Sequence, residues 1–193
     1  WRKEKRKITW IQWIMEIAAA AGLNILFSAL RSFLVSDYGI TSESQDALLT
    51  SRMLFQILGM GIAVPVTEEL IFRGLTLKYA KRAMPFWVAN LLQALLFGVF
   101  HMNMIQGVYA FVVGIVLGFI CEKSRSIYPS MLFHILFNIW GTFSPDWFMY
   151  KADTVPFFFL WFFVGAGLLV AGLFLFFFGV NKKYPKIENS YYS

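Results

Sequence analysis

The chain has 193 residues, of which 59% are hydrophobic, with 22 Phe, 7 Trp and a formal net charge of +6. Ordinary soluble domains contain roughly 45–50% apolar residues, so this composition excludes the soluble globular class and indicates an integral membrane protein. A single cysteine excludes an internal disulfide. We predict an all-α fold, a polytopic membrane helix bundle with about six transmembrane helices.

Six apolar segments follow one another along the chain. A helix needs about 20 mainly apolar residues to cross a hydrocarbon core of about 30 Å. The segments that approach or meet this length are residues 8–34, 53–77, 86–101, 105–121, 127–143 and 155–180. Almost nothing separates the third segment from the fourth, which predicts a tight helical hairpin.

The basic residues alternate along the chain in a way that predicts its orientation. They cluster before the first apolar segment and after the second, fourth and sixth, and the opposite loops are net acidic. Because cytoplasmic flanks of membrane helices are enriched in Lys and Arg, both termini are expected in the cytoplasm. The positive charge then reflects the topology, and the basic flanks are expected to contact anionic membrane lipid. No nucleic-acid partner is expected.

The organisation along the chain is simple, with no internal repeat and no low-complexity linker. We predict three parts. Residues 1–52 supply a basic flank, a transmembrane helix and an outer loop, residues 53–143 form a catalytic core, and residues 144–193 supply a final transmembrane helix and a basic tail. The chemistry-bearing residues all lie in the middle part.

The second apolar segment contains Glu68, Glu69 and Arg73. An ionisable side chain inside a bilayer costs roughly 2.5–3.5 kcal/mol on insertion scales, so such groups usually pair, line a cavity or do chemistry. Glu69 and Arg73 are i and i+4 on a helix and are predicted to pair. Glu68 lies one residue further round the helix, so the arginine neutralises it less, and it is better placed to act as a base towards water.

The third and fifth segments each carry one histidine with a partner four residues away. Phe97 and His101 share a helix face, so the ring can hold and shield the imidazole. His134 and Asn138 likewise lie side by side, and their N–H groups can hold a water or stabilise an oxyanion. Taken alone, each histidine would more often be a hydrogen-bonded packing residue than a catalyst.

Together the patterns EExxxR, FxxxH and HxxxN occur in this order on successive apolar segments within residues 53–143. This combination resembles the CAAX protease and bacteriocin-processing family (CPBP, also called ABI) of intramembrane endopeptidases. That family includes the type II CAAX prenyl endopeptidases. The resemblance implies a membrane-embedded hydrolase that performs intramembrane proteolysis or peptide processing.

The resemblance also implies six site residues, which are Glu68, Glu69, Arg73, His101, His134 and Asn138. In the mechanism proposed for the family, Glu68 and His101 would polarise a water for attack on a peptide carbonyl. His134 and Asn138 would stabilise the resulting oxyanion. The second acid and the arginine of the first motif would have a supporting role.

The resemblance implies a peptide or a membrane-tethered protein as substrate, cleaved near the cytoplasmic half of the bilayer. Eukaryotic members act on prenylated CAAX proteins, whereas bacterial relatives are linked to the processing of peptide signals or bacteriocins and to self-immunity. The chain is short and adds little to the core, so we expect an integral protein of a bacterial plasma membrane.

Three alternatives remain open at this stage. A zinc protease is the first, because the ligand set of a catalytic zinc site with one open position is matched by Glu68, His101 and His134. The sequence has no HExxH motif, however, and we expect no cofactor. A non-catalytic scaffold or bacteriocin immunity protein could keep the fold and block a peptide toxin. A small transporter could use the same acids and histidines as a proton relay, but the sequence has no inverted repeat.

The expected depths of these groups do not match for straight helices. At about 1.5 Å per residue, Glu68 lies about 15 Å from the basic flank at Lys78. His134 lies about 14 Å from Arg125, whereas His101 lies about 24 Å from the beginning of its helix. Either a tilted helix or a third segment that begins deeper in the bilayer could bring the three groups together.

Overall fold

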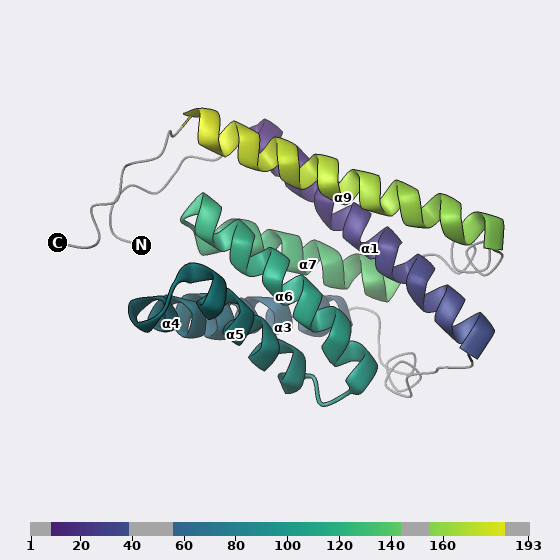
Figure 1. The fold of residues 1–193 in the computed structure, drawn as a ribbon, viewed down its shortest axis with the longest axis horizontal. Helices are drawn as coiled ribbons and strands as arrows, with labels where there is room; N and C mark the ends of the chain where they lie inside the picture. The colour runs from purple at the N-terminus through teal and green to yellow at the C-terminus, as the bar shows by residue number, and fades with distance from the viewer. Residues whose placement is uncertain (1–8, 39–55, 144–154, 184–193) are drawn as a thin grey trace.

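The structure is a computed structural model that describes residues 9–38, 56–143 and 155–183. These residues form helices joined by short turns, and no strand occurs among them, which confirms the predicted helical membrane bundle. Figure 1 shows the axes of α1, α7 and α9 lying at similar angles beside the hairpin of α5 and α6. The predicted N-terminal flank, both outer loops and the C-terminal tail lie outside the described residues.

The first and last helices pack against each other as a long antiparallel pair. They are α1, Trp10–Tyr38, and α9, Val155–Lys183. Thr9 precedes α1, and its backbone N–H donates to Gln12 Oε1 at 2.8 Å while the Gln12 N–H reaches the Thr9 hydroxyl at 3.4 Å. This is a capping box, which satisfies N–H groups that the first helical turn leaves without partners.

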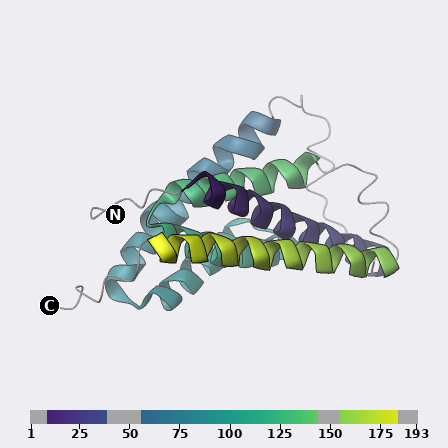
Figure 2. The ribbon, with the colours of Figure 1, turned by 90° about the horizontal axis from the view of Figure 1, so that it is seen from above.

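Glycines set the close approach of this pair. An added Cβ on Gly165 would lie 2.6 Å from the backbone nitrogen of Leu26, and one on Gly172 would lie 2.7 Å from that of Ala19. Small residues let membrane helices approach through their backbones. The long pair therefore packs by backbone contact, and Figure 2 shows α1 and α9 lying side by side over much of their length.

The second apolar segment forms one continuous helix of mixed geometry. It consists of η2, Gln56–Ala63, then α3, Val64–Glu69, then η3, Leu70–Leu77, and finally α4, Lys78–Ala83. The outer two of the first three pieces are π-helical, a geometry with i→i+5 hydrogen bonds that is frequent at functional sites. The helix continues past the predicted end at residue 77 and carries the basic flank as its last turn.

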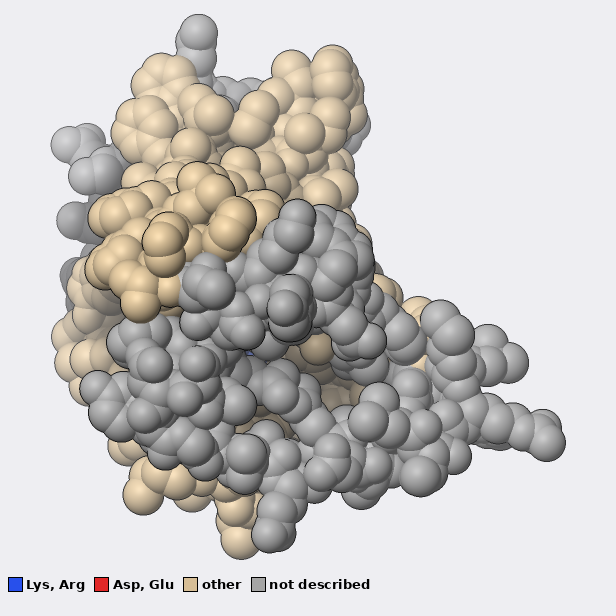
Figure 3. Space-filling view, turned by 90° about the vertical axis from the view of Figure 1, so that its right-hand side faces the viewer, with Lys and Arg blue, Asp and Glu red and all other residues tan. Residues whose placement is uncertain are grey.

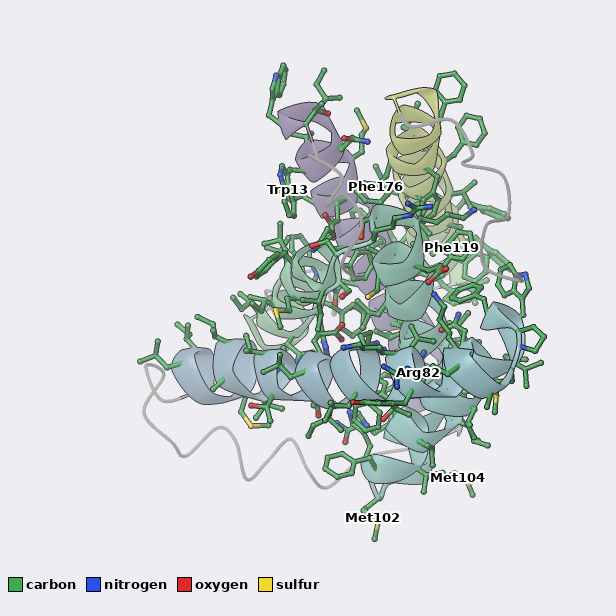
Figure 4. The ribbon with its side chains drawn as sticks, turned by 90° about the vertical axis from the view of Figure 1, so that its left-hand side faces the viewer. Trp13, Arg82, Met102, Met104, Phe119 and Phe176 are labelled. Carbon is green, nitrogen blue, oxygen red and sulfur yellow. The ribbon has the colours of Figure 1, made fainter. Side chains whose placement is uncertain are left out.

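The predicted hairpin is present as α5, Phe86–Phe100, and α6, Met104–Ser124. Met102 takes a positive φ of 53° in the turn, and the Asn103 side chain accepts a hydrogen bond from Gln106 N at 3.0 Å, which caps α6. Met102 and Met104 point outwards from this turn in Figure 4 and are 91% and 85% exposed. The turn thus presents two apolar side chains at the edge of the bundle.

Small residues also bring α5 and α6 together. An added Cβ on Gly114 would lie 3.0 Å from the Ala94 Cα, and one on Gly118 would collide with the Asn90 carboxamide. The GxxxG pair of Gly114 and Gly118 therefore lets α5 and α6 pack tightly. The fifth apolar segment, α7, Ile127–Phe143, packs between this hairpin and α1, around a core centred on Leu23, Leu117 and Phe133.

In the part of the chain that the structure describes, three helices are long and apolar enough to cross a membrane, and their apolar stretches are Trp10–Leu30, Met104–Ser124 and Val155–Phe178. The described Lys and Arg side chains outside the site gather at the ends of α4 and α6, near the chain termini (Figure 1). At the opposite end, the described surface in Figure 3 shows almost no charged residues. The chain is an integral membrane protein with its described basic side chains at one end, and the three-part division of the sequence stays a prediction.

Candidate active site

The six predicted site residues come from the continuous helix of residues 56–83, from the end of α5 and from α7. Glu68 and Glu69 end α3 and Arg73 follows in η3, His101 is the first residue after α5, and His134 and Asn138 lie in α7. The helix of residues 56–83 crosses α1 and α9 steeply, as Figures 2 and 4 show. A steep crossing is one of the two arrangements that could reconcile the mismatched depths, and the groups do converge.

Glu69 and Arg73 form the ion pair that their spacing predicts. Arg73 Nη1 lies 2.7 Å from Glu69 Oε1, and both side chains are 0% exposed. Arg73 Nη2 also donates to the Gly114 carbonyl of α6 at 3.2 Å, and the guanidinium carbon lies 4.7 Å from the centre of the Phe97 ring. The arginine therefore ties its own helix to both helices of the α5–α6 hairpin.

His134 lies between the two glutamates. Its Nδ1 is 3.0 Å from Glu69 Oε1, and its Nε2 is 3.5 Å from Glu68 Oε2. A carboxylate only accepts hydrogen bonds, so the Glu69 contact requires a proton on Nδ1 and fixes the orientation of the ring. Glu69 is thus tied to both Arg73 and His134, while the second nitrogen of the imidazole faces Glu68.

His101 is held by the Phe97 residue that precedes it by one turn. Its Nδ1 lies 2.8 Å from the Phe97 carbonyl oxygen, and the two rings meet edge to face at 4.8 Å. The ring of Phe97 also meets His134 edge to face at 5.5 Å. The predicted contact between Phe97 and His101 is confirmed, and this one buried ring lies against both histidines.

His101 and Glu68 do not contact each other directly. Among the described residues, neither a hydrogen bond nor an ion pair joins His101 to Glu68, and the imidazole that Glu68 does contact is His134. His101 is half-buried, whereas Glu68 is buried with 8% of its surface exposed. If these two residues act on one water, that water must lie between them.

Asn138 is placed by a backbone carbonyl that a proline leaves available. Its Nδ2 donates to the Met60 carbonyl oxygen at 3.2 Å. In the i→i+5 pattern of η2, the partner of that oxygen would be the N–H of residue 65, but residue 65 is proline and has none. Pro65 thereby supplies an acceptor for Asn138 just before the two glutamates.

The alternative zinc site would need Glu68, His101 and His134 around one metal ion, each at about 2.0–2.2 Å from it. His134 Nε2 lies 3.5 Å from Glu68 Oε2, but among the described residues neither a hydrogen bond nor an ion pair joins His101 to either of them. Within residues 9–38, 56–143 and 155–183, no group of three or more His, Cys, Asp or Glu side chains is arranged to hold a metal ion.

Asn90, Gln93 and Glu16 are among the buried polar side chains that the sequence analysis did not identify. Asn90 and Gln93 on α5 are 0% exposed, and Glu16 on α1 is 1% exposed with no hydrogen-bond partner among the described residues. The signal was present, because two carboxamides three residues apart interrupt an apolar helix opposite the GxxxG of Gly114 and Gly118. Glu16 is likewise an ionisable residue inside an apolar segment.

Comparisons with known proteins agree with the sequence-based family. Residues 50–140 match the family model described as Rce1-like, type II CAAX prenyl endopeptidase Rce1-like, and this range contains all six site residues. Neither the curated proteins nor the solved structures gave a match. The family is one of CAAX endopeptidases, which are hydrolases, and the chain is a membrane protease of this kind. Residues 50–140 thus match the Rce1-like type II CAAX prenyl endopeptidases, the kind of family that the three motifs predicted.

Proposed function

We propose that this protein is a metal-independent glutamate protease that hydrolyses a peptide bond inside the membrane. The observation that carries the proposal is the arrangement of two buried glutamates around the imidazole of His134, with the ring of Phe97 in contact with both His134 and His101. Glu69 is tied to Arg73, which leaves Glu68 as the carboxylate that can exchange a proton with a water.

The reaction proceeds in two steps. Glu68 takes a proton from a water that His101 helps to hold, the water oxygen bonds to the carbonyl carbon of the substrate, and the carbonyl oxygen becomes an oxyanion. The carbon–nitrogen bond then breaks, and the proton on Glu68 passes to the departing amine. The same carboxyl group acts first as base and then as acid.

The oxyanion is stabilised by His134 and Asn138. The Glu69 contact orients the ring of His134 so that Nε2 faces the space beside Glu68, and donation to the oxyanion requires a proton on this nitrogen. Asn138 gives one of the two N–H groups of its carboxamide. Such donors contribute most in a site that excludes water, because there they need no reorganisation during the reaction.

The substrate we propose is a peptide or a membrane-tethered protein, such as a peptide signal or a bacteriocin precursor, in a bacterial plasma membrane. The site lies among apolar helices with Glu69, Arg73 and His134 at most 3% exposed, which supports a substrate that is itself within the bilayer. The described basic side chains at the ends of α4 and α6 support a cytoplasmic position for that end.

The experiment is cleavage of a membrane-anchored peptide library by the purified protein in vesicles, with and without a chelator. Wild type is compared with Glu68→Gln and His101→Ala, and with Glu122→Gln as a control, because Glu122 pairs with Lys81 outside the site. We expect both site variants to lose cleavage, and wild type and the control to cleave with the chelator present. Loss of wild-type activity with chelator would favour the zinc protease, and a wild type that cleaves nothing would favour the non-catalytic scaffold.

A further inference from the structure

Two buried carboxamides on α5 bind the backbone of α6. Gln93 Nε2 donates to the Gly114 carbonyl at 2.9 Å and to Asn90 Oδ1 at 2.7 Å, and Asn90 Nδ2 donates to the Ile115 carbonyl at 3.1 Å. Both side chains are 0% exposed. Neither belongs to the three motifs that define the site.

The carbonyl that Gln93 binds is also the one that anchors the site arginine. Arg73 Nη2 donates to the same Gly114 oxygen at 3.2 Å, while Arg73 Nη1 pairs with Glu69 at 2.7 Å. Glu69 in turn holds His134 Nδ1 at 3.0 Å. A continuous series of polar contacts therefore leads from α5, through the backbone of α6, to the imidazole in α7.

Helix packing alone does not explain a glutamine at this position. A buried amide without all its partners costs about 1–3 kcal/mol, and Gln93 Oε1 has no hydrogen-bond partner among the described residues. The close contact of α5 with α6 is already provided by the glycines at 114 and 118. An apolar side chain of similar size would pack here without that cost.

We propose that Gln93 is a positioning residue that acts on the reaction through the Gly114 carbonyl and Arg73. This inference rests on the proposed function of the same site. By holding the Gly114 oxygen at a fixed place relative to α5, the Gln93 amide fixes where the guanidinium is anchored. The rigid fork of the guanidinium then sets the place of Glu69, which orients His134.

The expected effect is on the chemical step. A misplacement of about 1 Å far from the reacting atoms can lower a rate about 100-fold, and loss of one of two donors to the shared carbonyl should cause a smaller shift. We expect Gln93→Leu to lower kcat about 10-fold and leave KM unchanged, because Gln93 contacts neither glutamate nor histidine directly. A role in substrate binding would raise KM instead.

The test measures kcat, KM and thermal unfolding of the full-length protein in vesicles with a peptide that wild type cleaves. The matched control is Asn24→Leu, since Asn24 is another buried carboxamide that donates to a backbone carbonyl, that of Ala20, within α1. Gln93→Leu loses the hydrogen bonds to Gly114 and Asn90, and Asn24→Leu loses the one to Ala20, but only Gln93→Leu should lower kcat. Gln93→Asn, which keeps a shorter carboxamide, serves if leucine prevents folding, and it should lower kcat less than 10-fold.

A double-mutant cycle separates action through Arg73 from independent damage. In an Arg73→Lys background, Gln93→Leu should lower kcat by less than twofold, because the anchored guanidinium is already gone. Three results would each overturn the inference while leaving the proposed function intact. The losses of kcat from Gln93→Leu and Arg73→Lys could multiply in the double variant, kcat could be unchanged in Gln93→Leu, or Asn24→Leu could lose as much kcat as Gln93→Leu. A wild type that cleaves no peptide would overturn both.

Discussion

Removing the guanidinium of Arg73 is expected to destabilise the protein strongly. In Arg73→Met, the carboxylate of Glu69 stays fully buried and loses its cation at 2.7 Å. Breaking a buried ion pair by removing one partner typically costs about 3–5 kcal/mol, because an uncompensated charge remains. For a chain of this size, 1 kcal/mol corresponds to about 2–4 °C in unfolding temperature, so the midpoint should fall by about 6–20 °C.

The matched variant removes the charge from both partners. Replacing both members of a buried pair by uncharged residues often changes stability little. The double variant Glu69→Gln with Arg73→Met should therefore recover at least half of the fall in unfolding temperature. Activity should stay low in both variants, since neither retains the anchor on the Gly114 carbonyl. The assay is thermal unfolding in detergent, followed by near-ultraviolet circular dichroism. A single variant within 2 °C of wild type, or a double variant no more stable than the single, would refute this reasoning.

Three further predictions concern helix contacts, the oxyanion and metal. Gly118→Ala should lower the free energy of unfolding by about 1–3 kcal/mol, because the added methyl overpacks against α5. Gly167→Ala has nothing within 4 Å of its added Cβ, so its unfolding midpoint should be unchanged or raised. Equal midpoints for the two variants would contradict this prediction. Asn138→Ala should lower kcat about 100-fold, the loss typical of one oxyanion donor, and Pro65→Ala should lower it less, because an N–H at residue 65 competes for the same carbonyl. Full dialysis against a chelator should leave kcat unchanged. Loss of activity on dialysis, followed by its restoration with zinc, would show that the reaction depends on the metal.

The parts of the site that could be predicted from the sequence depend on local geometry. Glu69 with Arg73 and Phe97 with His101 are each four residues apart on one helix, so the periodicity of the helix alone places them together. The same is true of the GxxxG at Gly114, whose small residues predict a close neighbour without naming it. Apolar segment lengths likewise predicted the helices, apart from the extension of the second one to Ala83.

The remaining contacts depend on how distant helices pack. His134 and Glu69 are 65 positions apart, and Asn138 and Met60 are 78 apart. Whether His134 faces Glu69, Glu68 or both depends on the rotation of α7 about its axis, which the apolar pattern does not determine because several faces of that helix are apolar. The family mechanism pairs Glu68 with His101 through a water, and this pairing stays a prediction. The structure adds that His134 lies beside Glu68.

Gln93 shows that a polar residue in an apolar helix can indicate a contact with the site. The three motifs contain charged groups and histidines, so they do not predict a role for a neutral carboxamide in a membrane helix. Yet a buried carboxamide has to find partners, and Gln93 finds the carbonyl that Arg73 also uses. Glu16 on α1 offers the same signal and has no partner among the described residues.

The central claim is that Glu68 activates a water and does not itself attack the substrate. The most direct measurement is a single turnover in water enriched in ¹⁸O, with enzyme in excess over a cleavable membrane-anchored peptide and mass spectrometry of both product and protein. Our account predicts that the label enters the new carboxylate of the product in the first turnover while Glu68 stays unlabelled. Unlabelled product together with ¹⁸O in the Glu68 carboxylate would mean that the glutamate forms a covalent acyl intermediate, and would contradict the account.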